Sequence, residues 1–167
     1  MYREESWMND EQLGILYQQI AEVVADTIPE EWSKVYLYGE IVEGSQTAYF
    51  YYYPKVSDSP VYSHDITDFF TVSESEYSEK WHQLVDIIQK LWREFKDNDQ
   101  EPWTNLTLTL ENTGKFNIDF NYNDLSNADA HERKTIWKYK YLGIMPKSNS
   151  GKKHLEKYLE SVEKEAK

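Results

Sequence analysis

The chain has 167 residues, of which 40% are hydrophobic and 16% aromatic, which is enough to bury a single core. It has no cysteine, which excludes a disulfide scaffold, a thiolate metal site and a cysteine nucleophile. The net charge of −12 is unevenly spread: residues 1–132 carry 8 basic and 26 acidic groups, net −18, and residues 133–167 carry 10 and 4, net +6. The negative charge of residues 1–132 disfavours binding to nucleic acid and favours binding to a basic protein. A simpler explanation is that the acidic residues serve only to keep the protein soluble.

The beginning of the chain, "MYREESWMNDEQ", has no basic leader followed by an apolar run. No window of the sequence approaches the length of a membrane span. We therefore expect a soluble cytoplasmic protein without a membrane partner.

The first elements are a helix and a hairpin. Asn9 or Asp10 is expected to cap a helix that ends before Pro29, because apolar side chains recur at helical spacing at Leu13, Leu16, Tyr17, Ile20, Val24 and Ile28. The segments "SKVYLYGEIVE" and "TAYFYYYP", joined by a turn at "EGSQ", predict a hairpin that ends at Pro54. The run "KVSDSPVYSHDITDFF" then has turn residues at "SDSP" and one short strand-like piece.

A second helix and a second hairpin follow. The amphipathic helix is predicted by an apolar stripe with charged residues on its other face: Trp81, Leu84, Val85, Ile88, Leu91, Trp92 and Phe95. After "KDNDQEP" the period changes to two, in the segments "NLTLTL" and "FNIDFNY" on either side of the turn "ENTGK". Strict alternation indicates a sheet with one face on the core and one facing water, and Asp119 lies on the polar face.

The last part of the chain is predicted to be helical. "SNADAHERKTIWKYKYLGIMP" is expected to form a helix up to Gly143, capped by Ser126 or Asn127. "SNSG" then loosens the chain before the charged helix "KKHLEKYLESVEKEAK". The predicted fold is a single α+β domain over residues 1–147, with an antiparallel sheet built from hairpins and amphipathic helices on one face, plus a C-terminal helical tail over residues 148–167.

A metal or acid/base site is the first candidate for the acidic stretch after the second hairpin. Asp119, Asp124, Asp129, His131 and Glu132 supply hard ligands, but no His pair at i, i+4 and no calcium-type loop accompanies them. The pair His64 and Asp65 is the only other acid/base candidate, and neither a nucleophile elbow nor a phosphate-cradling loop is present. We therefore predict no catalytic residue, no metal site and no cofactor.

Simpler structural roles account for several of the same residues. Asp124 and Asp129 suit a turn and a helix start, because Asx side chains satisfy free backbone amides there. The tyrosines of "YFYYYP" could stack on nucleic-acid bases, but aromatic residues in strands more often belong to the core. We favour the core, because residues 1–132 are too acidic to attract nucleic acid. The basic run "RKTIWKYKY" suits either phosphates or the negative end of a helix.

Four segments together resemble one known family. "MNDEQLGILYQQIAEVV", "HDITDFF", "QEPWTNLTLTLENTGKFNIDFNYNDL" and "ERKTIWKYKYLGIMP" closely resemble the YezG/EsaG-type immunity proteins, antitoxins paired with secreted nuclease toxins. The resemblance spans roughly residues 8–146, and the blocks "EPWTNLT" and "KYKYLG" carry most of its specificity. Because residues before Met8 fall outside it, Met8 is an alternative start to Met1.

The resemblance implies a non-enzymatic function. The protein would bind the basic nuclease domain of a cognate toxin, exported by a type VII-like system, and keep it inactive in the producing cell. We expect the contacts at the polar face and following turn of the second hairpin, at Asp119, Asp124, Asp129 and Glu132, with the water-facing acids of the second helix. The alternatives are a metal-dependent hydrolase using the Asp119 to Glu132 cluster and a non-enzymatic adaptor, and self-association is left open.

Overall fold

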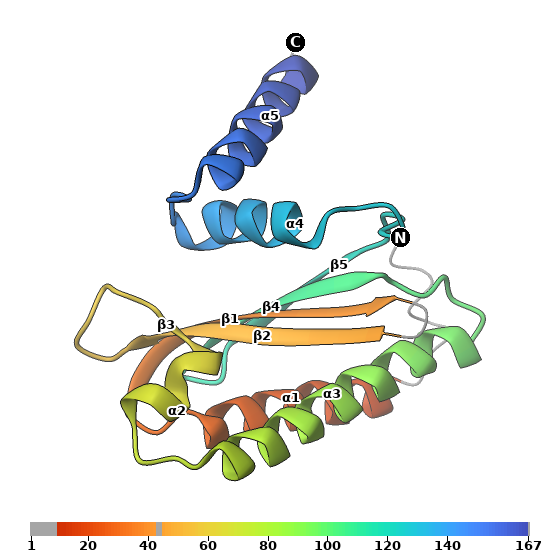
Figure 1. The fold of residues 1–167 in the computed structure, drawn as a ribbon. Coiled ribbons are helices and arrows are strands. Elements are labelled where there is room, and N and C mark those ends of the chain that lie inside the picture. Colours follow the sequence, from red (N-terminus) through yellow and green to blue (C-terminus); the bar gives the residue numbers. More distant parts are fainter. Residues whose placement is uncertain (1–9, 43–44, 167) are drawn as a thin grey trace. The chain divides into compact units, whose positions relative to one another are not determined.

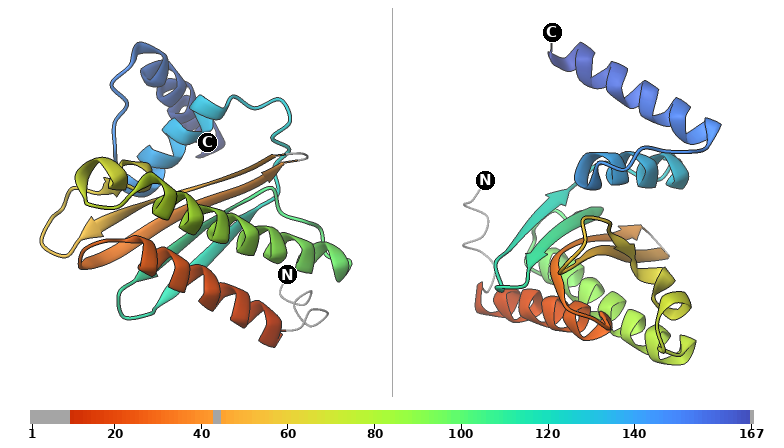
Figure 2. Two further views of the ribbon diagram at one scale, coloured as in Figure 1. Left: turned by 60° about the horizontal axis from the view of Figure 1, so that its bottom comes forward. Right: turned by 90° about the vertical axis from the view of Figure 1, so that its left-hand side faces the viewer.

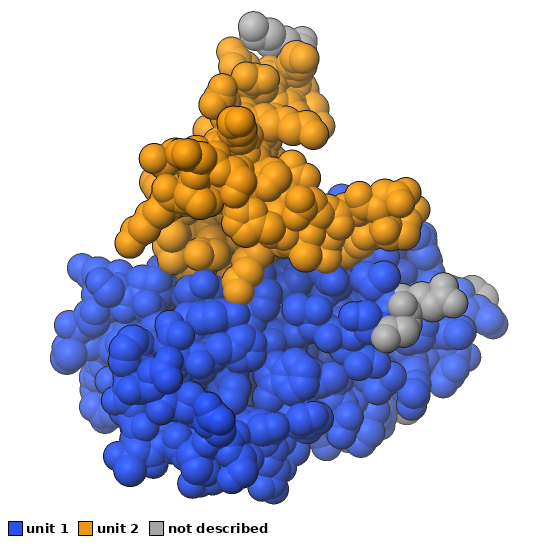
Figure 3. Space-filling view, viewed as in Figure 1, with its two compact units in different colours: residues 1–123 blue, residues 124–167 orange. Residues whose placement is uncertain are grey.

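The computed structural model of the chain describes residues 10–42 and 45–166. The chain forms two compact units, residues 1–123 and residues 124–167, which are coloured separately in Figure 3. The first unit contains the sheet and the helices that cover it, and the second contains the remaining helices. The predicted α+β class is confirmed, and the predicted boundary between residues 1–147 and a tail at 148–167 stays a prediction.

A five-stranded antiparallel sheet is the centre of the first unit. Its strands are β1 (Trp32–Val42), β2 (Ser45–Pro54), β3 (Val61–Tyr62), β4 (Asn105–Glu111) and β5 (Phe116–Asn121), in the order β3-β2-β1-β4-β5. Both predicted hairpins are confirmed, and the short strand after "SDSP" is β3. The hairpins are joined through β1, which pairs with β4 from Lys34 opposite Glu111 to Glu40 opposite Asn105.

Two long helices cover one face of this sheet. Helices α1 (Asp10–Thr27) and α3 (Glu74–Asp97) lie side by side beneath it in Figure 1 and in front of it in the left view of Figure 2. The short helices η2 (Ser63–Asp65) and α2 (Ile66–Phe69) connect β3 to α3. Both long helices were predicted, although the proposed cap Asn9 lies outside the described residues. No helix among residues 10–42 and 45–166 is long and apolar enough to cross a membrane.

The period-two pattern gives the sheet two chemically different faces. The first face packs on α1 and α3 and supplies the sheet's share of the core: Val35, Leu37, Ile41, Ala48, Phe50, Tyr52, Leu106, Leu108 and Leu110. The second face carries the alternate residues: Tyr36, Tyr38, Glu40, Tyr49, Tyr51, Tyr53, Thr107, Asn117 and Asp119. Burying the apolar half of each strand supplies the main driving force for this arrangement, at about 25 cal/mol per Å² of apolar surface.

The second unit consists of α4 (Ala130–Trp137), a π-helical segment η3 (Lys138–Leu142) and α5 (Asn149–Ala166). The helix predicted to reach Gly143 does so, and Gly143 ends it with a φ of 69°. The predicted cap at Ser126 or Asn127 is wrong, because Asp129 caps α4. The preceding residues form a turn instead, in which the amide of Ser126 donates to Asp124 and that of Ala128 donates to the Leu125 carbonyl.

Candidate partner-binding surfaces

Asp119 is the predicted contact residue that belongs to the first unit. It lies on β5, opposite Thr107 of β4, and its side chain is exposed. Its neighbours on the same face of β5 are Asn117 and Asn121, so this strand presents a row of polar groups. The row follows from alternation, because Phe116, Ile118 and Phe120 take the positions that face α1 and α3.

The side chains of Asp124 and Asp129, in the second unit, both accept hydrogen bonds from backbone amides two or three residues further along the chain. The amide of Ser126 donates to Asp124 Oδ1 over 2.9 Å, and the amides of His131 and Glu132 donate to Asp129 Oδ1 over 2.8 and 3.2 Å. These hydrogen bonds lower the pKa of both carboxyl groups below their usual values. The two residues therefore have the turn and capping roles considered from the sequence, and both side chains remain exposed and ionised near neutral pH.

Glu132 contributes to the packing of α4 against α5. Its Oε2 lies 3.5 Å from Nδ1 of His154, and the ring of His154 lies 5.3 Å from that of His131. The side chains of Glu132 and His154 keep only 28% and 23% of their surface exposed. The four predicted contacts are thus divided between the units, one in the first and three in the second.

The water-facing acids of α3 are the last part of the predicted surface. Glu79, Asp86 and Asp97 are exposed on the side of the helix away from Leu84, Ile88 and Leu91. Ser73 caps this helix by accepting from the Glu76 amide over 3.1 Å. The exposed acids of α3 add to the negative charge of the first unit. Residues 1–123 carry 8 basic and 23 acidic side chains, a net charge of −15.

A tyrosine cluster on the second face of the sheet was not predicted. It consists of Tyr38, Tyr49, Tyr51 and Tyr62, with ring centroids of 4.9 to 6.4 Å between contacting pairs. The sequence favoured core for the tyrosines of "YFYYYP". Tyr49, Tyr51 and Tyr52 are indeed buried, Tyr52 on the first face of the sheet and Tyr49 and Tyr51 on the second. The strict alternation with Phe50 and Tyr52 is the signal that predicts this division.

The acid/base candidate His64 lies at the end of this cluster. Its Nδ1 is 2.6 Å from the hydroxyl of Tyr77, and its ring meets Tyr62 at 5.0 Å. Burial raises the pKa of Tyr62 to about 12 and that of Tyr49 and Tyr51 well above the usual tyrosine value. These phenols are therefore neutral at physiological pH, and Tyr49 and Tyr51 are buried, so they contribute to packing on this face rather than to an open aromatic surface.

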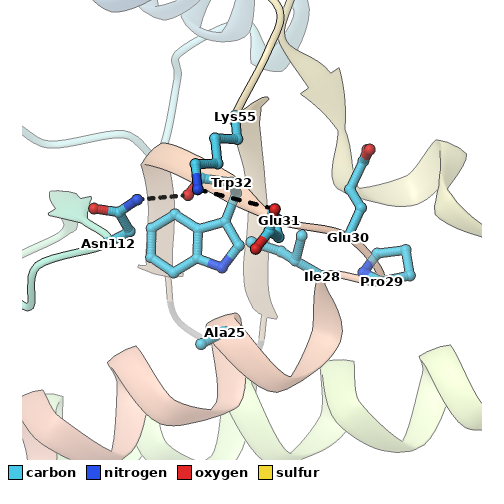
Figure 4. Close-up of a pocket in the computed structure, with 8 residues that line it drawn as sticks. All are labelled: Ala25, Ile28, Pro29, Glu30, Glu31, Trp32, Lys55 and Asn112. Carbon is cyan, nitrogen blue, oxygen red and sulfur yellow. Dashed lines mark hydrogen bonds and ion pairs between the residues drawn. The ribbon is translucent and has the colours of Figure 1, made fainter.

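An open pocket of about 590 Å³ lies where α1 gives way to β1 (Figure 4). Its lining comes from three stretches of the chain: Ala25, Ile28, Pro29, Glu30, Glu31 and Trp32, then Lys55, then Asn112. The indole of Trp32 forms one wall, and the Glu31 carboxylate lies 4.0 Å from the Lys55 ammonium. Sequence patterns did not indicate this pocket, because its residues are separated by more than one element along the chain.

Metal chemistry has no supporting geometry in the described part of the chain. Nowhere in residues 10–42 and 45–166 do three His, Asp or Glu side chains come together as a metal ion would require. The Asp119 to Glu132 acids proposed for a hydrolase are held as a strand residue, a turn residue, a helix cap and a contact of His154. The described surfaces offer negative charge and an open pocket with an aromatic wall, which suits binding to a protein.

Comparison with known proteins identifies the family. The model of the YezG-like immunity protein family matches residues 13–156. Immunity protein YezG of Bacillus spizizenii is 41% identical over 158 residues, covering 93% of this chain and 98% of that protein. The chain belongs to the YezG-like immunity protein family. Immunity protein YezG of Bacillus subtilis is 38% identical, with 86% and 97% covered, and the type VII secretion system protein EsaG of Staphylococcus aureus is 30% identical, with 92% and 98% covered.

Membership of the YezG-like family assigns a non-enzymatic function. An immunity protein acts by binding a cognate toxin, so the partner is a protein rather than a turned-over substrate. The match extends from α1 into α5, and therefore covers the first unit from residue 13 onward, the pocket, α4 and the first part of α5. The resemblance found in the four sequence segments is confirmed.

Proposed function

We propose that this immunity protein binds the nuclease domain of a toxin exported by a type VII secretion system and keeps it inactive in the cytoplasm of the producing cell. The observation that carries the nuclease assignment is the net charge of −15 on residues 1–123. A nuclease must present a basic surface to the phosphate backbone of its substrate, and an acidic domain competes for that surface. The same field accelerates encounter between the two proteins.

The proposed contacts remain Asp119, Asp124, Asp129 and Glu132, together with the exposed acids of α3. In support, Asp119 is exposed on a polar strand. The hydrogen bonds that hold Asp124 and Asp129 also favour their ionised forms, so both present a fixed negative charge to a cationic partner. Inhibition on this proposal is steric and electrostatic: the immunity protein occupies the surface along which the nucleic acid would run.

A DNA-digestion assay tests the proposal. The nuclease domain encoded beside this gene is incubated with a plasmid, with and without the full-length immunity protein. We expect cleavage to stop at about one molar equivalent and the two proteins to co-elute from a sizing column. Undiminished cleavage at a tenfold excess, with separate elution, would show that the partner is not this nuclease.

Charge reversal tests the proposed contacts. The variant carrying Asp119→Lys and Asp124→Lys is expected to bind the nuclease domain at least tenfold more weakly. The matched control carries Glu22→Lys and Glu163→Lys, which makes the same change in net charge at one exposed residue of each unit, outside the proposed contacts. Equal affinities of the two variants would remove Asp119 and Asp124 from the interface.

A further inference from the structure

We infer that the pocket around Trp32 receives an arginine side chain of the toxin. This inference rests on the proposed function and adds a further contact to those proposed above. The first observation is a β-bulge at the start of β1. Trp32 is opposite Pro54, but Lys34 is opposite Tyr53, so Ser33 is an extra residue in the strand. A bulge re-aims the side chains on either side of it. Without it, Trp32 would share the second face with Lys34 and Tyr36. Instead its indole lies on the side of the first face, beside Ala25 of α1 and Ile28.

The bulge is held in place by a side chain from the other hairpin. Asn112, in the turn between β4 and β5, donates from Nδ2 to the Trp32 carbonyl over 3.0 Å and from its backbone amide to the Ser33 carbonyl over 3.1 Å. Both carbonyls at the bulge are therefore satisfied without a partner from β2. On the other side, the Lys55 amide donates to the Glu31 carbonyl over 3.0 Å. The backbone that carries Trp32 is thus fixed before any ligand arrives, which lowers the entropic cost of binding.

The polar groups around the indole select a cation. Glu30 accepts a hydrogen bond from the Tyr52 hydroxyl over 2.6 Å, and Figure 4 shows its carboxylate turned away from Trp32. Glu31 is the acid beside the ring, and its side chain is 82% exposed. Its contact with Lys55 is long, at 4.0 Å, and Lys55 is 60% exposed, so this ion pair contributes little to stability. An incoming cation can take the place of Lys55 at no great cost.

Arginine fits this arrangement better than lysine. Its planar guanidinium stacks on an indole face and at the same time donates two parallel hydrogen bonds to a carboxylate. Its aliphatic stem covers apolar surface such as that of Ile28 and Pro29. The pocket opens from an acidic unit, so arginines on the basic surface of a nuclease are drawn toward it.

The test measures binding of the toxin's nuclease domain to four variants of the full-length protein by surface plasmon resonance. Glu31→Lys and Trp32→Leu are expected to raise Kd at least tenfold, chiefly by faster dissociation. Glu22→Lys is the matched control, because it makes the same charge change at an exposed position of α1. It is expected to change Kd less than threefold and through association. Lys55→Gln, which removes the competing cation, should leave Kd unchanged or lower it.

Each result decides the inference. If Glu31→Lys and Glu22→Lys have equal Kd and dissociation rates, or if Lys55→Gln weakens binding, the pocket is not a receptor for arginine. Glu31 is so exposed that its substitution is compatible with folding, so the decision does not depend on Trp32→Leu. If the wild-type protein neither binds nor inhibits the nuclease domain, both the proposed function and the inference about the pocket are wrong. If the wild-type protein binds and the pocket variants bind with the same Kd, only the inference about the pocket is wrong.

Discussion

Two glycines of the first unit occupy opposite backbone environments. Gly14 lies within α1 with nothing within 4 Å of where a Cβ would be, whereas Gly114, in the β4–β5 turn, has a φ of 95°. Alanine is more favourable than glycine in a helix by about 1 kcal/mol, and a left-handed backbone costs a residue with a Cβ roughly 1–2 kcal/mol. We expect Gly14→Ala to raise the free energy of unfolding in urea and Gly114→Ala to lower it, by about these amounts. If both substitutions changed the free energy of unfolding in the same direction, the helical backbone of Gly14 or the left-handed backbone of Gly114 would be wrong.

The tyrosine cluster predicts a loss of stability in alkali. The pKa of Tyr62 is raised to about 12, and those of Tyr49 and Tyr51 are raised further above the value of about 10 in an unfolded chain. Because the folded state holds these protons more tightly, their contribution is complete below about pH 10 and is lost as the pH rises toward 12. Calorimetry should show Tm falling steeply above pH 10 and less steeply in Tyr62→Phe. A Tm that stays level up to pH 11.5 would refute this.

Among the elements, α3 depends most clearly on its buried stripe. Leu91 is fully buried between this helix and the sheet, whereas the adjacent Lys90 is exposed. Deleting a buried leucine side chain removes apolar contact and leaves a cavity, which costs about 2–5 kcal/mol. Leu91→Ala should lower the free energy of unfolding by that amount in urea, and Lys90→Ala should change it by less than about 0.5 kcal/mol. Similar losses for both would mean that α3 is not anchored by this stripe.

The predicted elements succeeded where side-chain periodicity determines structure. Burial of alternate residues fixed both hairpins, and the stripe from Trp81 to Phe95 fixed α3. The cap of α4 was misplaced because Ser126 and Asp129 are equally good caps in isolation. The choice between them follows from the Asp124 turn, which uses the backbone of Ser126. The β1–β4 pairing was out of reach, since no local pattern specifies which edges of two hairpins meet.

The candidate binding residues were also predictable from the sequence only in part. The acidic charge and the residues Asp119, Asp124, Asp129 and Glu132 were visible in the sequence, because charge is a property of composition. The Trp32 pocket was not visible, because it needs one extra residue in β1 and the arrival of Lys55 and Asn112 from other segments. A bulge leaves no signature in the alternation of so short a stretch as "EWSKV".

At the scale of the whole molecule, the charge of the first unit predicts how association responds to salt. Its net charge of −15 attracts a basic domain over distances that salt screens, with a Debye length of about 8 Å at physiological ionic strength. Stopped-flow mixing with the nuclease domain should show the association rate falling at least tenfold between roughly 20 and 500 mM NaCl. The dissociation rate should change far less. An association rate indifferent to salt would argue against electrostatic attraction to this partner.

Because β1 lies between β2 and β4, the immunity protein cannot complete its sheet until β4 has been synthesised. The central strand leaves the ribosome early, but Leu106, Leu108 and Leu110, which complete the core beside it, come much later. At roughly 5–20 residues per second, translation reaches Glu111 on the order of 10 s after it starts. A fragment that stops before Asn105 has only three of the five strands and lacks the β1–β4 pairing, so it cannot complete the core. The protein therefore cannot protect a cell until about that long after its own translation begins, and any toxin that is active sooner must be bound by immunity protein folded in an earlier round.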